Sequence, residues 1–175
     1  MTTKKLIFIA GLICVFVLLY FNAYSVISGD LNFFNDVARD FLLLRELDEK
    51  KIVLIGPRAN STGLFHGPLW TYINYPALLV GNGNPIVVGW FWIILLTIFL
   101  VSGYFIASSI LFSYAGLAYV MLLASHTTPF INGLFHSLTN FFFIPVFFYT
   151  AYMYFKTKKW KYLGFHLCIT GIIVQ

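Results

Sequence analysis

Charged residues are scarce in this chain of 175 residues. Only 10% of the residues are Asp, Glu, Lys or Arg, whereas 60% are hydrophobic and 20% are aromatic. A soluble globular domain carries about 25% charged residues, so a water-soluble chain of this composition would lack the polar side chains to cover its surface. The shortage of charge therefore excludes an ordinary soluble domain and predicts an integral membrane protein, whose main partner is the lipid bilayer.

Acidic residues are absent from most of the sequence, because all six lie within residues 30–49. Basic residues form three groups, at residues 4–5, 39–58 and 156–161. None of these groups is a basic stripe on a soluble face, which is what binding to nucleic acid requires, so we expect no nucleic-acid partner. The first and last groups instead predict how the chain is oriented in a membrane.

Cysteine is rare as well. Cys14 and Cys168 both lie inside apolar runs, and the sequence has no CxxC pair and no His/Cys spacing typical of a metal site. We interpret both residues as buried or lipid-facing thiols. The sequence therefore predicts no metal-binding residues.

What the sequence has in abundance is apolar runs, and they predict an all-α, polytopic transmembrane protein with about five spans. The predicted spans cover residues 6–27, 86–106, 107–124, 138–155 and 162–175. The second and third spans come from one uncharged stretch that exceeds the roughly 20 residues of a single span, so we expect a tight hairpin near 107–113. A cleaved signal peptide is the alternative for 6–27, but this run is longer than the usual apolar core of about 7–15 residues.

The last apolar run stops at Gln175, before it reaches the length of a span. We therefore expect residues 1–175 to be the N-terminal part of a single membrane domain in a longer protein. A short re-entrant or tilted last helix is the alternative interpretation.

The positive-inside rule predicts the topology. Lys4 and Lys5 place the N-terminus in the cytoplasm, and four spans later the basic group 156–161 returns to the same side. The loops 28–85 and 125–140 then share the outer side. We expect a multi-pass protein of the cell membrane with a cytoplasmic N-terminus.

The first outer loop contains two predicted short helices at the membrane interface. In 33–51, the residues Val37, Phe41, Leu44 and Leu47 recur at helical spacing and form one apolar stripe, and we place Asp36, Arg39 and Asp40 on another side. Such a helix lies along a membrane surface rather than crossing it. A second helix begins at Pro68 and carries aromatic residues typical of the interface, namely Trp70, Tyr72 and Tyr75.

The segment Asn35-Asp-Val-Ala-Arg-Asp40 is the strongest candidate for chemistry. Asp36 and Asp40 are one helical turn apart, and Arg39 follows Asp36 by three residues. A carboxylate near the bilayer is costly unless it is paired or functional, and a positioned carboxylate can serve as a general base. The alternative is a solvated helix face with ordinary i,i+3 pairing, and spacing alone favours that alternative.

Histidine is a weaker candidate. His66, His126 and His136 all fall on the predicted outer side, where three imidazoles could in principle bind a metal. No two of them are spaced at i,i+4, so we interpret each as a residue that makes interfacial hydrogen bonds. His166 lies in an apolar run on the other side, and we expect a structural role for it.

Three short motifs resemble the N-terminal part of the C-type glycosyltransferases. They are Asn35-Asp-Val-Ala-Arg-Asp40, Leu54-Ile-Gly-Pro-Arg58 and Gly63-Leu-Phe-His-Gly-Pro-Leu-Trp-Thr-Tyr72. More narrowly, the chain is similar to family 39, which includes the protein mannosyltransferases and related bacterial sugar transferases. The resemblance implies an inverting transfer of a sugar from a polyprenyl-phosphate donor to an acceptor, unknown here, on the outer face of the membrane.

The resemblance also implies roles for individual residues. An acidic residue early in the first outer loop is the family's catalytic base, which maps onto Asp36. Val37 follows where many members have a second acid, so Asp40 stays open as the alternative base. Arg39, Asp40, Arg58 and His66 are the expected substrate-binding residues, with cations stabilising the leaving phosphate. The resemblance leaves open whether a divalent cation serves as a cofactor. Because members of the family also bind the donor through later loops, we expect residues 1–175 to be inactive on their own.

A function from another class is a membrane transporter or a non-catalytic accessory subunit. A transporter typically has charged residues inside its spans and internal repeats. The predicted spans here are uncharged apart from their ends, and the sequence has no evident repeat. These features favour the transferase over the transporter and leave an accessory subunit as the remaining alternative.

Overall fold

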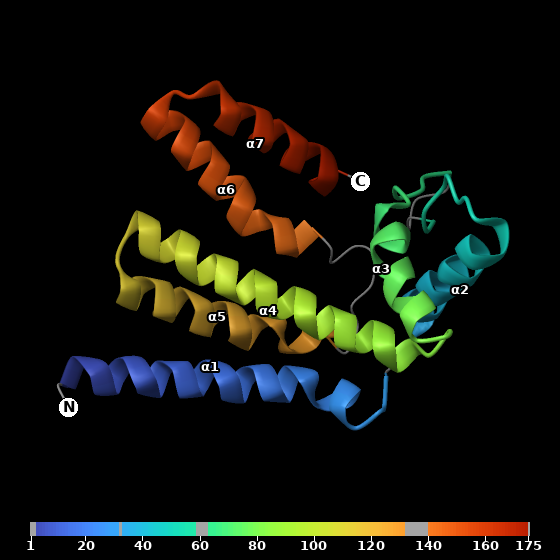
Figure 1. Cartoon of the computed structure of the whole chain (residues 1–175), viewed down its shortest axis with the longest axis horizontal. Helices are drawn as coiled ribbons and strands as arrows, with labels where there is room; N and C mark the ends of the chain where they lie inside the picture. Colours follow the sequence, from blue (N-terminus) through green and yellow to red (C-terminus); the bar gives the residue numbers. More distant parts are fainter. Residues whose placement is uncertain (1–2, 32, 59–62, 132–139, 175) are drawn as a thin grey trace.

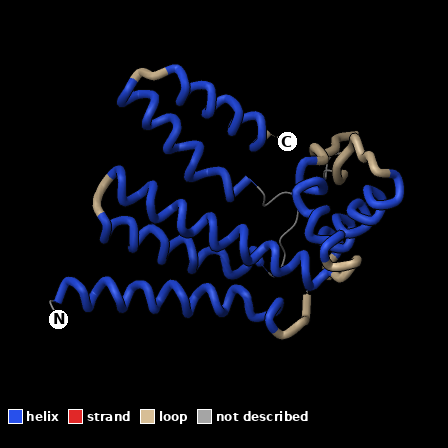
Figure 2. Tube along the Cα trace, in the orientation of Figure 1, coloured by secondary structure: helices blue, strands red, loops and turns tan. Residues whose placement is uncertain are grey.

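The computed structural model describes residues 3–31, 33–58, 63–131 and 140–174, and in these residues it has seven α-helices and no strand. The helices are α1 (Thr3–Ile27), α2 (Asn35–Lys50), α3 (Leu69–Val80), α4 (Pro85–Ile110), α5 (Ser113–Ile131), α6 (Asn140–Thr157) and α7 (Trp160–Ile173). Most of the described trace is helical (Figure 2). The all-α class expected from the sequence is confirmed for this part of the chain.

The long helices lie side by side and the two short helices of the first loop gather at one end of them (Figure 1). Contacts run from α1 to α5, from α5 to α4, from α4 to α6 and from α6 to α7. The N-terminus and the turn between α6 and α7 lie at the end opposite to α2 and α3 (Figure 1). The first and last basic groups of the sequence are therefore at the same end, and the acid-bearing helix is at the other.

Local signals explain where the helices begin and end. The side chain of Asn84 accepts a hydrogen bond from the Ile86 N–H at 2.9 Å, and Pro85 occupies the first turn of α4. α4 ends at Ile110 and α5 begins at Ser113, within the hairpin expected near 107–113. Lys51 ends α2 with a φ of 64° while its N–H bonds the Leu47 carbonyl at 2.8 Å.

Within the described ranges, α1 and α4 are the two helices that are both long and apolar enough to cross a bilayer, with 25 and 26 residues. By comparison α5, α6 and α7 have 19, 18 and 14 residues, and a perpendicular span needs roughly 20. Large apolar side chains point outward from the bundle, among them Phe16, Ile98, Phe148 and Phe165. Such a surface is unfavourable in water and favourable in lipid.

The helices approach closely where small or hydrogen-bonding residues meet. A Cβ added to Gly116 of α5 would meet the side chain of Ser108 and lie 2.9 Å from the Tyr104 carbonyl oxygen on α4, so glycine permits this contact. Asn22 of α1 is buried, and its Nδ2 donates to the Ala124 carbonyl of α5 at 3.0 Å. One buried amide therefore connects the first helix to the hairpin.

One expected loop is wrong in its first part. Residues 125–131 were assigned to an outer loop because they are polar, but α5 continues through Ile131. The Ser125 hydroxyl donates to the Leu122 carbonyl at 2.8 Å, and the Thr127 hydroxyl donates to the Ala124 carbonyl at 3.0 Å. Polar side chains that bond the preceding turn are compatible with a helix. The remainder of that expected loop, 132–139, lies outside the described residues.

Candidate functional site

The helix pair α2–α3 is fastened to the end of α4 by one apolar cluster and one polar bond. Val37 and Leu44 of α2 and Trp70 of α3 are buried together with Trp92 of α4. The indole N–H of Trp92 donates to Oδ1 of Asn74 at 2.7 Å, and both side chains are buried. A buried donor and acceptor that satisfy each other fix the position of α3 on α4.

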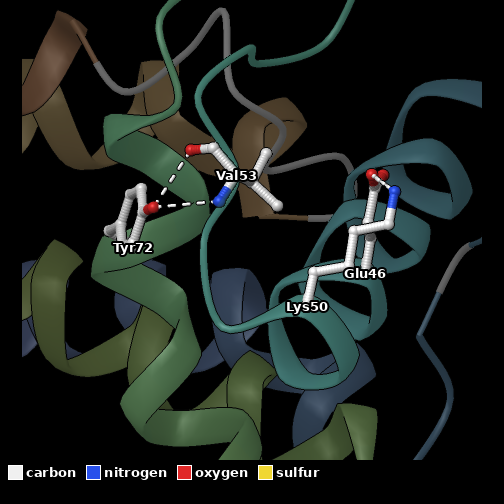
Figure 3. A network of polar contacts seen from close by, with 4 residues as sticks. All are labelled: Glu46, Lys50, Val53 and Tyr72. Atoms are coloured by element: carbon white, nitrogen blue, oxygen red, sulfur yellow. Dashed lines mark hydrogen bonds and ion pairs between the residues drawn. The ribbon is translucent and has the colours of Figure 1, made fainter.

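α2 and α3 run antiparallel, and tyrosines of α3 hold the end of α2 and the segment after it. The Tyr75 hydroxyl donates to Asp48 at 2.8 Å. The Tyr72 hydroxyl accepts from the Val53 N–H and donates to the Val53 carbonyl, each at 3.0 Å (Figure 3). The bond from Tyr75, together with Lys51 at 3.1 Å, holds the pKa of Asp48 below its usual range.

The interfacial placement is wrong for Trp70, and Tyr72 and Tyr75 have protein partners that the sequence did not predict. Trp70 is buried in the apolar cluster rather than placed at a lipid interface. Tyr72 and Tyr75 use their hydroxyl groups on the segment after α2 and on α2 itself. The physical reason is that a tyrosine hydroxyl prefers a fixed partner when protein offers one at hydrogen-bond distance.

Asp36 and Arg39 form the ion pair that their spacing predicts. Arg39 Nη2 donates to Asp36 Oδ1 at 2.8 Å, and the two side chains are 36% and 40% exposed, respectively. An exposed pair of this kind contributes little to stability, about 0–1 kcal/mol. It does orient the Asp36 carboxylate while leaving it open to a ligand.

Asp40 is buried whereas the side chains of Asp36 and Arg39 are partly exposed, and this corrects the expected helix face. It is only 8% exposed and lies between the buried residues Val37 and Leu44. Four helical residues turn about 40° past a full circle, so Asp40 is equally close in direction to Asp36 and to Leu44. Its burial places it at the edge of the stripe that faces the protein. A buried carboxylate is costly unless its partners satisfy it, which makes Asp40 a positioned group.

Arg39 has a second feature that points to a ligand. Its Nε atom is buried and has no hydrogen-bond partner among the described residues. An unsatisfied buried donor costs about 1–3 kcal/mol. A substrate oxygen would satisfy this donor only if the Arg39 side chain turned to expose Nε.

Arg58 and His66 are brought together by a closed loop between α2 and α3. The Gly56 N–H bonds the His66 carbonyl at 3.0 Å, and the His66 N–H bonds the Pro57 carbonyl at 2.8 Å. Arg58 pairs with Phe65 in an isolated antiparallel bridge. Arg58 is exposed, and the loop tip at 59–62 lies outside the described residues. The loop therefore brings the backbones of Arg58 and His66 close together, although Arg58 shares its face of the bridge with Phe65 and not with His66.

The two groups of candidate residues lie at opposite ends of α2. Phe33, which precedes α2, and Ala38 and Phe41 of its first half line a cavity together with Leu78 and Pro85 at the junction of α3 and α4. The far end of α2 meets the beginning of α3, next to the loop of Arg58. Fourteen helical residues span about 21 Å, so Asp36 and Arg58 can share only an extended ligand.

The histidines do not form a metal site in the part of the chain that the structure describes, where no cluster of three or more His, Cys, Asp or Glu could hold a metal ion. His126 is on α5, where its Nδ1 lies 2.9 Å from the Leu122 carbonyl oxygen. His166 stacks on Phe147 with ring centroids 4.3 Å apart, as expected for a structural residue. His136 lies outside the described residues.

Sequence reasoning did not single out Asn74, and it gave Tyr72 an interfacial role rather than a role in positioning α3. Both residues lie in an apolar and aromatic segment. The partner of Asn74 is Trp92, 18 residues away in the chain, and the partner of Tyr72 is Val53, 19 residues away. The signal that was available for Asn74 is a lone amide in an apolar helix, since such a group needs a buried partner.

Comparisons of the chain with protein-family models, with curated proteins and with solved structures found no match. The interpretation of the site therefore depends on its own geometry and on the motifs within the sequence.

Proposed function

We propose that this chain belongs to a membrane glycosyltransferase that moves a sugar from a polyprenyl-phosphate donor to an acceptor hydroxyl. Asp36 is the general base and Arg39 orients it. The observation that carries the proposal is the Asp36–Arg39 pair, an open carboxylate beside a buried guanidinium Nε that lacks an acceptor among the described residues. An acceptor hydroxyl can reach the open Asp36 carboxylate, and a turn of the Arg39 side chain would let Nε donate to an oxygen of the same substrate.

The position of this pair supports a lipid-carried donor. α2 lies at one end of a set of helices whose outer surfaces are strongly apolar (Figure 1). A donor on a polyprenyl chain can keep its hydrocarbon in the bilayer while its phosphate and sugar reach the surface where α2 lies. A water-soluble donor would not require a site next to the bilayer.

The reaction is a single displacement at the anomeric carbon. The acceptor oxygen forms the new C–O bond as the bond to polyprenyl phosphate breaks, and the configuration inverts. Asp36 takes the acceptor proton, so no net charge is left on the new glycoside. The leaving phosphate keeps the electron pair of the broken bond, and nearby cations stabilise it. Arg58 and His66 would bind a remote part of an extended substrate, because about 20 Å of α2 separates them from Asp36.

The direct test is transfer of labelled sugar from a polyprenyl-phosphate donor in membranes that contain the protein, expressed from its complete reading frame. Transfer above that of membranes without the protein supports the proposal. Absence of transfer to a range of hydroxyl acceptors, with the protein present and folded, contradicts it.

We also propose the finer membrane arrangement: five spans in the cell membrane, α1, α4, α5, α6 and α7, with a cytoplasmic N-terminus and with α2 and α3 at the outer surface. Tilt would let the shorter helices take part. The support is that the N-terminal lysines and the lysines of 156–161 lie at one end of the long helices, whereas α2 and α3 lie at the other end (Figure 1). Basic residues prefer the cytoplasmic side.

This topology predicts opposite labelling at two exposed turns. In a chain whose native cysteines are replaced by serine, Leu64→Cys should react with an impermeant maleimide in intact cells, and Thr157→Cys should react only after the cells are opened. Leu64 is 61% exposed in the loop between α2 and α3, and Thr157 ends α6. Labelling of residue 157 in intact cells, with protection of residue 64, would show that the orientation is the opposite of the one proposed.

A second prediction concerns how α2 lies against the protein and the membrane surface. Spin labels placed singly along α2 should show accessibility with a period near 3.6 residues. We expect minima at Val37, Asp40, Leu44 and Leu47, the four residues that are buried. Uniform exposure to water along the helix would contradict this placement, and a minimum that skips residue 40 would contradict the burial of Asp40.

A further inference from the structure

A cavity lies at the end of the bundle that is remote from the proposed active site. It has a volume of about 390 Å³ and is formed by the first turns of α1, the second half of α4 and the beginning of α5. Its lining residues are Lys5, Phe8, Ile9, Tyr104, Ser113 and Tyr114. The N-terminus and the turn between α4 and α5 are at the same end of the molecule (Figure 1).

The charge in this cavity is positive and has no counter-charge nearby. Lys5 contributes an ammonium group, and Lys4 precedes it. All six acidic residues of the sequence fall within 30–49, and α2, which holds most of them, is at the opposite end of the bundle (Figure 1). An ion attracted to Lys5 therefore competes with no carboxylate of this chain.

The remaining lining residues supply hydroxyl groups and an apolar wall. Tyr104 and Ser113, whose side chains carry hydroxyl groups, also line the cavity. The Tyr114 hydroxyl donates to the Lys4 carbonyl at 3.0 Å and holds α5 against α1. The Phe8 ring packs edge-on against Tyr104 and Tyr114, with centroids 6.3 and 6.2 Å apart. A lining with Lys5 and hydroxyl-bearing residues beside the aromatic ring of Phe8 suits a molecule with an anionic headgroup and a hydrocarbon tail.

We propose that this cavity binds the headgroup of an anionic phospholipid in the leaflet where the N-terminus of α1 lies. The phosphate contacts Lys5 and the hydroxyl groups of Tyr104 and Ser113. The acyl chains follow the apolar sides of α1 and α4, where Ile9 and Phe105 are exposed. Basic residues at a membrane surface attract anionic lipids, and here a cavity adds a defined position. The proposal is independent of the transferase, because none of these residues belongs to the proposed active site.

The test is native mass spectrometry of the detergent-solubilised chain, titrated with phosphatidylglycerol or with phosphatidylcholine of the same acyl chains. One phosphatidylglycerol should be retained preferentially. Lys5→Gln should weaken that retention about fivefold, the factor that corresponds to one basic residue near a membrane surface. Lys4→Gln is the matched control, since it removes the same charge from the same helical turn but does not line the cavity.

Each outcome decides for or against the site. Preferential retention that depends on Lys5 and hardly on Lys4 supports it. Equal loss in both variants would mean diffuse attraction without a site, and equal retention of the two lipids would overturn the proposal. Glycerol phosphate, which has the headgroup charge without the acyl chains, separates the two sources of phosphate. If it displaces the lipid at equal concentration, the cavity binds a free anion and the lipid proposal is wrong.

Discussion

Asp36→Asn should lower the rate of sugar transfer by about 10²–10⁴-fold, the usual contribution of a general base. The amide has nearly the shape of the carboxylate but cannot take the acceptor proton. Binding of the polyprenyl-phosphate donor should persist, because the base acts on the acceptor. Initial rates at saturating donor, together with separate donor-binding measurements on the protein from its complete reading frame, will show whether only the chemical step is lost.

Two variants on the same helix make this result specific. Glu46→Gln removes an exposed carboxylate that pairs with Lys50 at 2.7 Å (Figure 3), so it should leave transfer nearly unchanged. Asp40→Asn changes a buried carboxylate and should lower stability more than the chemical rate. If Asp40→Asn abolishes transfer while Asp36→Asn is nearly normal, Asp40 is the base. If both variants are nearly normal, the proposed transferase mechanism is wrong.

The positions of the helices followed from local features of the sequence. The expected helix at 33–51 is α2, Asn35–Lys50, and its end coincides with the paired lysines of which Lys51 adopts a left-handed conformation. The helix expected to open at Pro68 is α3, which begins at Leu69. Capping by Asn84 and the hairpin before Ser113 are also local. Such features depend on residues that are close together in the chain, so they can be predicted from the sequence alone.

The site was only partly predictable, because its geometry depends on distant residues. The pairing of Asp36 with Arg39 follows from i,i+3 spacing alone. The burial of Asp40 depends on what covers α2, because a count of 100° per residue places it equally near the partly exposed Asp36 and the buried Leu44. Nothing local links Asn74 to Trp92. The separation of Asp36 from Arg58 follows from the length of the predicted helix, but the backbone bonds that close the loop around Arg58 could not be predicted.

Gly56→Ala should open the loop that holds Arg58 and His66 together. A Cβ at position 56 would lie 2.6 Å from the His66 carbonyl oxygen and would also collide with the Gly67 carbonyl oxygen. Backbone oxygens can move away only if the two hydrogen bonds that close the loop are broken. Each is worth about 0.5–1.5 kcal/mol, so closure should weaken by about 1–3 kcal/mol and the open population should rise about 5- to 150-fold.

Reactivity of a cysteine at position 53 measures this opening. Val53 is buried just before the loop, where Tyr72 bonds its backbone, so Val53→Cys should be protected in an otherwise cysteine-free chain and exposed when Gly56→Ala is added. Gly164→Ala on α7 is the matched control, because a Cβ there meets no atom within 4 Å. If Arg58 and His66 also bind the donor, Gly56→Ala should raise the KM for donor and leave kcat nearly constant, since Asp36 is at the other end of α2. Unchanged protection of residue 53 in Gly56→Ala would show that the backbone accommodates the methyl group and that the glycine is not what keeps this loop closed.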